Sequence, residues 1–128
     1  MIFKHFIEFF PELAEKETRR ITLRNDPQIP DGEYAFVDSY CKDKDCDCRR
    51  VYFDVLQIDP DYKRFHAATI SYGWEDLDFY LSWAPDMAPE RVRLMKGPIL
   101  QPAQQQSQYA QRFLELFETK FLLSLIHI

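Results

Sequence analysis

The chain has 128 residues, a formal net charge of −5 at pH 7 and a sequence pI near 5.2. An acidic chain without clustered Lys and Arg lacks the surface that nucleic-acid binding requires. No stretch approaches the ~20 apolar residues that a membrane span needs. With 46% hydrophobic residues, one core can form, so we expect a single domain over residues 1–122. We also expect a cytoplasmic location and reduced thiols, with neither nucleic acid nor membrane as a partner.

The first half of the chain predicts one helix followed by strands. Apolar side chains at helical spacing over residues 2–10 predict a short amphipathic helix that ends before Pro11. Alternating residues predict strands over residues 18–24 and 33–40. β-Branched and aromatic residues predict another over 50–58, and the turn before residue 65 and the glycine at 73 bound a last one over 65–72. The turns between the last three are short and rich in Asp, Pro or Cys, which predicts an antiparallel meander.

The second half predicts helices. Residues 75–83 carry an apolar stripe at helical spacing, and a short turn or helix over residues 88–95 follows. Residues 98–108 are rich in Pro and Gln, which is typical of an exposed connector. From Gln108 to Phe121, apolar residues at helical spacing predict a last amphipathic helix.

Together these elements predict an α+β fold with a three- to four-stranded, mainly antiparallel sheet. We expect the helix starting near Gln108 and the one starting near Glu75 to cover one face of this sheet. Their apolar residues should then be buried against alternating strand residues, namely Phe113, Phe117, Leu77 and Tyr80.

All three cysteines lie in the turn between the second and third predicted strands. Cys41, Cys46 and Cys48 have the spacing C-x4-C-x-C among charged residues, so apolar packing does not explain them. Zinc takes four ligands and favours thiolates. The neighbouring Arg49 and Arg50 should lower the pKa of the thiols and offset thiolate charge. The sequence therefore predicts a structural zinc site at this turn.

A fourth zinc ligand has to come from another residue. His66 is a poor candidate, because at about 3.3 Å per strand residue it would lie roughly 25 Å from the turn. A group beyond the present C-terminus is a further possibility. The carboxylates expected near the turn are those of Asp43, Asp45, Asp47, Glu75 and Asp76.

No other part of the chain carries a recognisable catalytic pattern. The three glycines are too far apart for a phosphate-binding loop or a dinucleotide fingerprint, and no nucleophile elbow accompanies His5 or His66. We therefore predict a non-catalytic interaction module with a possible protein partner. The alternative is a thiol-based redox enzyme or sensor, in which Arg49 or Arg50 activates one cysteine. A third interpretation is that the three cysteines are ordinary reduced residues.

Residues 40–51 contain the motif Tyr-Cys-x4-Cys-Asp-Cys-Arg-Arg-Val, and residues 68–75 read Ala-Thr-Ile-Ser-Tyr-Gly-Trp-Glu. With residues 16–19 and 95–98, these segments resemble an uncharacterised bacterial protein family. The resemblance spans most of residues 9–122. Members of that family often continue into a SEC-C-like cysteine-rich zinc motif, which this chain lacks. The resemblance implies no activity.

Residues 123–128, Leu-Ser-Leu-Ile-His-Ile, are identical to a translation of the transposon mosaic-end adaptor used to prepare sequencing libraries. We therefore expect the native sequence of this segment to differ, and His127 to have no function. The alternative is a natural apolar tail on the last helix. If the domain is truncated near Leu122, the side chains of Phe117, Phe121 and Leu122 should be partly uncovered.

Overall fold

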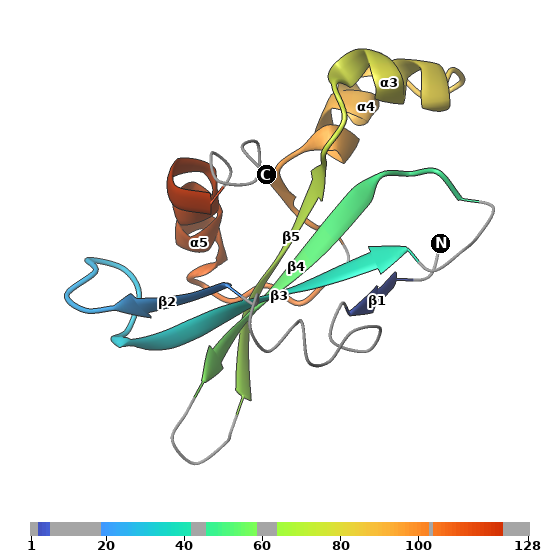
Figure 1. The fold of residues 1–128 in the computed structure, drawn as a ribbon. Helices are drawn as coiled ribbons and strands as arrows, with labels where there is room; N and C mark the ends of the chain where they lie inside the picture. Colours follow the sequence, from blue (N-terminus) through green and yellow to red (C-terminus); the bar gives the residue numbers. More distant parts are fainter. Residues whose placement is uncertain (1–2, 6–18, 42–45, 59–63, 103, 122–128) are drawn as a thin grey trace.

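The structure is a computed structural model that describes residues 3–5, 19–41, 46–58, 64–102 and 104–121. Its strands are β1 Phe3–His5, β2 Arg19–Leu23, β3 Gly32–Cys41, β4 Arg50–Ile58, β5 Arg64–Gly73 and β6 Ile99–Leu100. They form one antiparallel sheet in the order β1-β3-β4-β5-β6, and β2 also pairs with β3 (Figure 1). The predicted α+β class with an antiparallel sheet is confirmed.

The central meander follows the predicted strands closely. β3 pairs with β4 as far as Tyr40 opposite Val51, so the cysteines lie in the turn of this hairpin. β4 pairs with β5 from Arg50 opposite Gly73 to the far end of the sheet, where Leu56 faces His66. The register therefore brings the end of β5 back to the cysteine turn and keeps His66 away from it.

The sheet is wider than predicted, with five strand positions rather than three or four. Phe3–His5 form β1 against the end of β3, so the helix predicted over residues 2–10 is wrong for these three residues. The rest of that prediction lies outside the described residues. Ile99–Leu100 of the predicted connector form β6 against β5. Both additions occupy edges of the meander, where unpaired N–H and C=O groups favour a further strand.

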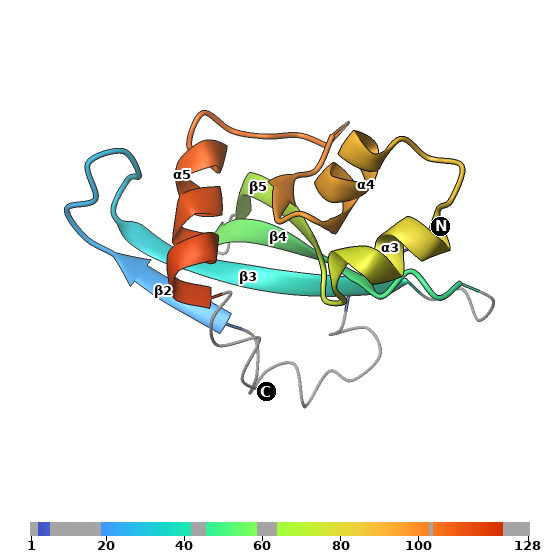
Figure 2. The same ribbon diagram turned by 90° about the horizontal axis from the view of Figure 1, so that it is seen from above.

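The described helices are α3 Leu77–Trp83, α4 Pro89–Lys96 and α5 Ala110–Leu116, which continues as a π-helical turn, η1 Phe117–Phe121. Helix α5 lies across one face of the sheet (Figure 2). Phe113 packs against Tyr34 with ring centroids 4.9 Å apart, and Phe117 packs against Phe53 at 5.2 Å. These contacts form the main core, as predicted for the last helix.

The expectation that truncation leaves Phe117 partly uncovered is wrong. The side chain of this residue is fully buried against the sheet. The described part of the chain does not include the side chain of Phe121 or any part of residues 122–128.

Helix α3 differs from the prediction in its placement, and α4 lies beside it. They pack on each other beyond the end of β5, beside the cysteine turn, rather than α3 lying across the sheet (Figures 1 and 2). Tyr80 is fully buried, but its ring lies over Gly73, where an added Cβ would come within 2.4 Å of Tyr80 Oη. Leu77 is only half-buried. Close packing over a glycine therefore fixes α3 at the end of the sheet.

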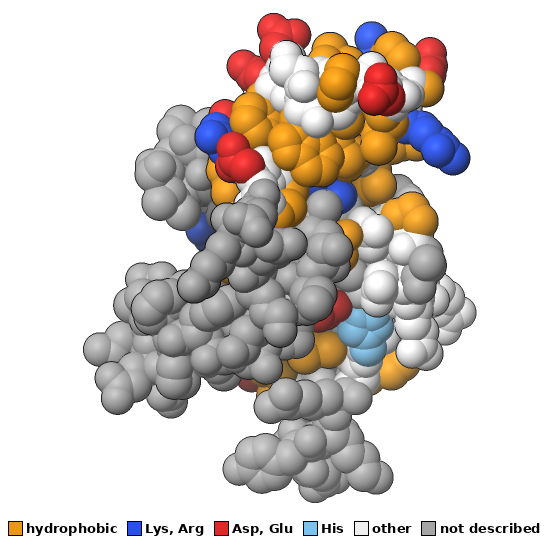
Figure 3. All heavy atoms as spheres, turned by 90° about the vertical axis from the view of Figure 1, so that its right-hand side faces the viewer, with side chains coloured by type: hydrophobic (Ala, Val, Ile, Leu, Met, Phe, Trp, Pro, Cys, Tyr) orange, Lys and Arg blue, Asp and Glu red, His pale blue; other side chains and the backbone are white. Residues whose placement is uncertain are grey.

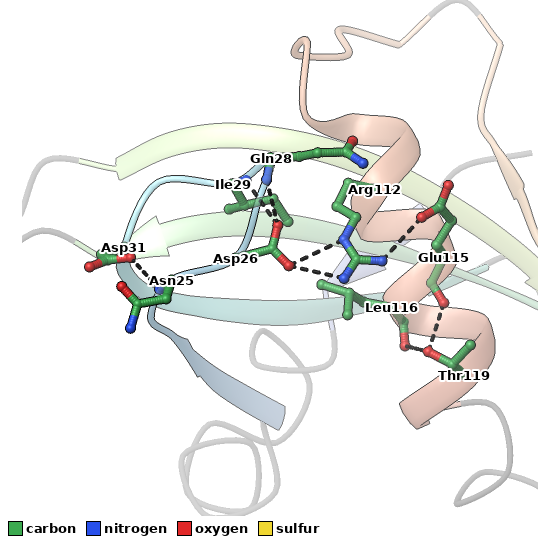
Figure 4. Close-up of polar contacts among 9 residues, drawn as sticks. All are labelled: Asn25, Asp26, Gln28, Ile29, Asp31, Arg112, Glu115, Leu116 and Thr119. Atoms are coloured by element: carbon green, nitrogen blue, oxygen red, sulfur yellow. Dashed lines mark hydrogen bonds and ion pairs between the residues drawn. The ribbon is translucent and has the colours of Figure 1, made fainter.

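A partly buried ion pair ties α5 to the turn between β2 and β3 (Figure 4). Arg112 Nη2 and Nε donate to Asp26 Oδ1 at 3.0 and 3.2 Å. The other oxygen of Asp26 accepts the backbone N–H groups of Gln28 and Ile29, each at 3.0 Å. The hydrogen bond from Arg112 lowers the pKa of the Asp26 carboxyl below its ordinary value of 3.8. The Asp26 carboxylate is therefore stabilised in its charged form.

Replacing this carboxylate should weaken the fold in a pH-dependent way. Asp26→Asn should lower the free energy of unfolding at neutral pH by about 1 kcal/mol, since charged hydrogen bonds contribute modestly when one partner is partly exposed. Because the folded pKa is lowered, this stabilisation is present above the unfolded pKa and is lost as pH falls through the folded pKa. Urea unfolding should show a difference in free energy of unfolding between the wild type and Asp26→Asn at neutral pH, and this difference should disappear at acid pH.

Asp86→Asn is the matched control, because Asp86 is exposed and the substitution removes the same charge. Equal losses of stability in the two variants would contradict the account of Asp26.

Candidate metal centre

The three cysteines come together at the β3–β4 turn. The sulfur atoms of Cys41, Cys46 and Cys48 all lie within 4.8 Å of one another. All three thiols are free; Cys48 is buried and the other two are half-buried. Thiolates bound to a tetrahedral ion at about 2.3 Å lie roughly 3.8 Å from each other. The sulfurs are therefore close enough to hold one metal ion after a small adjustment.

Burial dominates the chemistry of Cys48. It raises the pKa of this thiol to about 12, with a further contribution from a hydrogen bond with Cys46, against the opposing effect of the Arg50 backbone N–H. A metal ion would replace the proton and supply the positive charge that a buried thiolate needs. The prediction that Arg49 and Arg50 lower the thiol pKa is therefore wrong for Cys48.

The guanidinium groups of these two arginines bind other residues. Arg50 is 6% exposed, donates from Nη2 to Ser71 Oγ at 3.2 Å and lies over the ring of Tyr52. Its Nε is buried without a hydrogen-bond partner in the described part of the chain. Arg49 donates to the carboxylates of Asp47 and Glu75. Both guanidinium groups therefore have hydrogen-bond partners other than the cysteines.

The carboxylates predicted as a fourth ligand have other partners where the structure describes them. Asp47 and Glu75 each accept hydrogen bonds from Arg49. Asp76 caps helix α3, with its side chain accepting the N–H of Phe79 at 2.9 Å. Within the described residues, the metal-ligating cluster consists of the cysteines alone. The remaining candidates lie outside the described residues, namely Asp43 and Asp45.

The backbone beside Cys48 links the cysteine turn to the helices, which the sequence pattern did not reveal. Arg49 has a left-handed φ of +46°, and its carbonyl accepts the Trp74 N–H at 3.2 Å and the Tyr80 O–H at 2.6 Å. Lys96 Nζ, at the end of α4, donates to the carbonyl of Gly73 at 3.1 Å. The turn, the end of β5 and the α3–α4 pair are therefore one connected unit.

Sequence reasoning also missed a polar cluster at the far end of the sheet. A β-bulge opposite Val55 and Leu56 places His66 beside Asp54 and Thr69. His66 Nε2 lies 3.2 Å from Asp54 Oδ1 and 2.9 Å from Thr69 Oγ1, and these two oxygens lie 2.8 Å apart. A proton relay needs the acid and the nucleophile on different histidine nitrogens. Thr69 is also 2% exposed, so this cluster does not form a nucleophile site.

Comparisons with known proteins give no information on the function of this chain. No protein-family model, curated protein or solved structure matches the chain. The family resemblance of the cysteine motif therefore stays a prediction. Among the described residues, no helix has both the length and the apolar character needed to cross a membrane.

The contact between Gly73 and Tyr80 predicts a specific loss of stability. In Gly73→Ala, the new Cβ would lie 2.4 Å from Tyr80 Oη and 2.5 Å from Cζ, so the buried ring must shift. Overpacking of this kind costs about 1–3 kcal/mol. Urea unfolding should show this loss in the wild-type background and a smaller loss in a Tyr80→Leu background. The same loss in both backgrounds would show that Tyr80 is not the obstacle.

Proposed function

We propose that the chain is a zinc-binding module in which Cys41, Cys46 and Cys48 hold a structural zinc ion at the β3–β4 turn. The observation that carries the proposal is the convergence of three sulfur atoms within 4.8 Å. Thiolate ligands favour zinc over magnesium and calcium, which prefer oxygen. In a reducing cytoplasm the thiols would remain available for the metal.

We further propose that the module acts through a protein partner rather than by catalysis. Hydrophobic side chains gather at the α3–α4 end of the molecule (Figure 3). Among the described residues, Trp74, Met87 and Leu94 are exposed, with Leu94 at 58%. Exposed apolar side chains of this kind are frequent at protein interfaces. A zinc ion at the adjoining turn would stabilise the end of the sheet that carries these helices.

The competing function is that of a thiol-based redox enzyme or sensor. Its support is the closeness of two half-buried thiols, those of Cys41 and Cys46. Against it, the guanidinium groups of Arg49 and Arg50 bind other residues, so the activating cations that this mechanism requires are engaged elsewhere. Metal content and thiol reactivity separate the two functions.

Protein purified without chelator should contain one zinc ion per chain. Removing the ion should lower the unfolding temperature, because a metal that binds only the folded chain stabilises it, while the core that α5 buries on the sheet keeps the metal-free chain folded. Cys48→Ser should bind zinc much more weakly, because it removes the buried ligand. Elemental analysis and thermal unfolding with and without chelator measure both effects.

His66→Ala is the control, because His66 is a potential zinc ligand that lies at the far end of the sheet. It should retain one zinc ion per chain. A wild-type chain without metal and with one fast-reacting thiol would support the redox function instead.

Asp76 provides a test of the fourth ligand. Because its carboxylate caps helix α3, and Asn caps helices about as well as Asp, Asp76→Asn should leave both zinc affinity and stability nearly unchanged. Competition with a chromophoric chelator measures the affinity. A large loss of affinity at unchanged stability would instead identify Asp76 as the fourth ligand.

A further inference from the structure

The side chain of Arg49 bridges the cysteine turn and helix α3. Its Nε and Nη2 donate to the two oxygens of Asp47 at 2.9 and 3.3 Å. On the other side, Nη1 donates to Glu75 Oε1 at 2.9 Å, and the guanidinium lies 4.5 Å from the centre of the Phe79 ring. One planar cation therefore contacts the turn, the residue before the helix cap and the helix itself.

The position of Asp47 makes this bridge relevant to the metal centre. Asp47 is the residue between Cys46 and Cys48, so a contact that fixes its carboxylate also restrains the backbone that joins these two proposed ligands. A two-point bond from arginine to a carboxylate fixes orientation as well as distance, which a lysine cannot do. The bridge therefore restrains the segment that presents two of the three sulfur atoms.

The backbone of Arg49 points to the same role. Its φ of +46° lies in the left-handed region, where glycine would be less strained. An arginine at such a position requires support from its surroundings. Its carbonyl receives that support from the Trp74 N–H and the Tyr80 O–H. The chain thus retains a strained residue directly after Cys48 whose side chain makes the bridge.

We infer that Arg49 is the positioning residue of the metal centre: by clamping Asp47 against Glu75 and Phe79, it holds Cys46 and Cys48 in ligand geometry. This inference rests on the proposed zinc function. It also gives Asp47 and Glu75 a role in orienting the centre rather than in binding the ion. Groups that orient metal ligands commonly change metal affinity 10- to 100-fold when they are removed.

The exposure of the clamp separates this role from a merely structural one. The side chains of Arg49 and Asp47 are 40% and 66% exposed. Exposed ion pairs contribute little to overall stability. Loss of the clamp should therefore change zinc affinity far more than it changes the stability of the metal-free fold.

The test measures zinc affinity of the full chain by competition with a chromophoric chelator, alongside urea unfolding of the metal-free protein. Arg49→Ala should lower zinc affinity about 10- to 100-fold with a nearly unchanged urea midpoint. Arg49→Lys keeps the charge without the two-point bond and should recover only part of the affinity. Arg91→Ala, at an exposed arginine of α4, is the control and should bind zinc like the wild type.

A double-mutant cycle tests the pairing itself. Asp47→Asn should lower zinc affinity to a similar extent as Arg49→Ala, and the double variant should lose little more. Wild-type zinc affinity in Arg49→Ala, or a loss explained by an equally destabilised fold, would overturn the inference alone. A wild-type chain that binds no zinc would overturn the proposed function, and the inference with it.

Discussion

The antiparallel pairing of β3 with β4 is the constraint on which the rest of the structure depends. Its last pair, Tyr40 opposite Val51, brings Cys41 at the end of one strand close to Cys46 and Cys48 before the other. The packing of α5 against the same strands holds this pairing in place, because it buries Phe113 and Phe117 on the sheet. The three cysteines therefore lie at the end of a hairpin whose strands are packed against α5.

The parts of the fold that could be predicted from sequence are those set by local patterns. β-branched and aromatic residues between turn residues mark β3, β4 and β5, and the short connections make neighbouring strands pair. Three thiols in one turn had to be close in space wherever that turn lay. The helical spacing of Phe113 and Phe117 likewise predicted their burial, which is confirmed. The separate expectation that truncation leaves Phe117 partly uncovered was wrong.

The parts that could not be predicted depend on contacts between distant residues. Phe3–His5 form a strand because they pair with the edge of β3. The sequence of these three residues alone does not indicate that pairing. The bulge beside Val55 shifts His66 by one residue and so changes its face and its partners. Arg49 was expected to act on the adjacent thiols, yet its side chain extends to Glu75, 26 residues away in sequence. Adjacency in sequence therefore did not reveal the partners of the Arg49 side chain.

In the proposed zinc centre, three thiolates of one turn surround a single metal ion, and Arg49 holds α3 against that turn. The most direct measurement is X-ray absorption at the zinc edge on protein purified without chelator. We expect three sulfur atoms at about 2.3 Å from zinc and one oxygen or nitrogen ligand at about 2.0–2.2 Å. A spectrum with fewer than three sulfur ligands, or protein that carries no zinc, would contradict it.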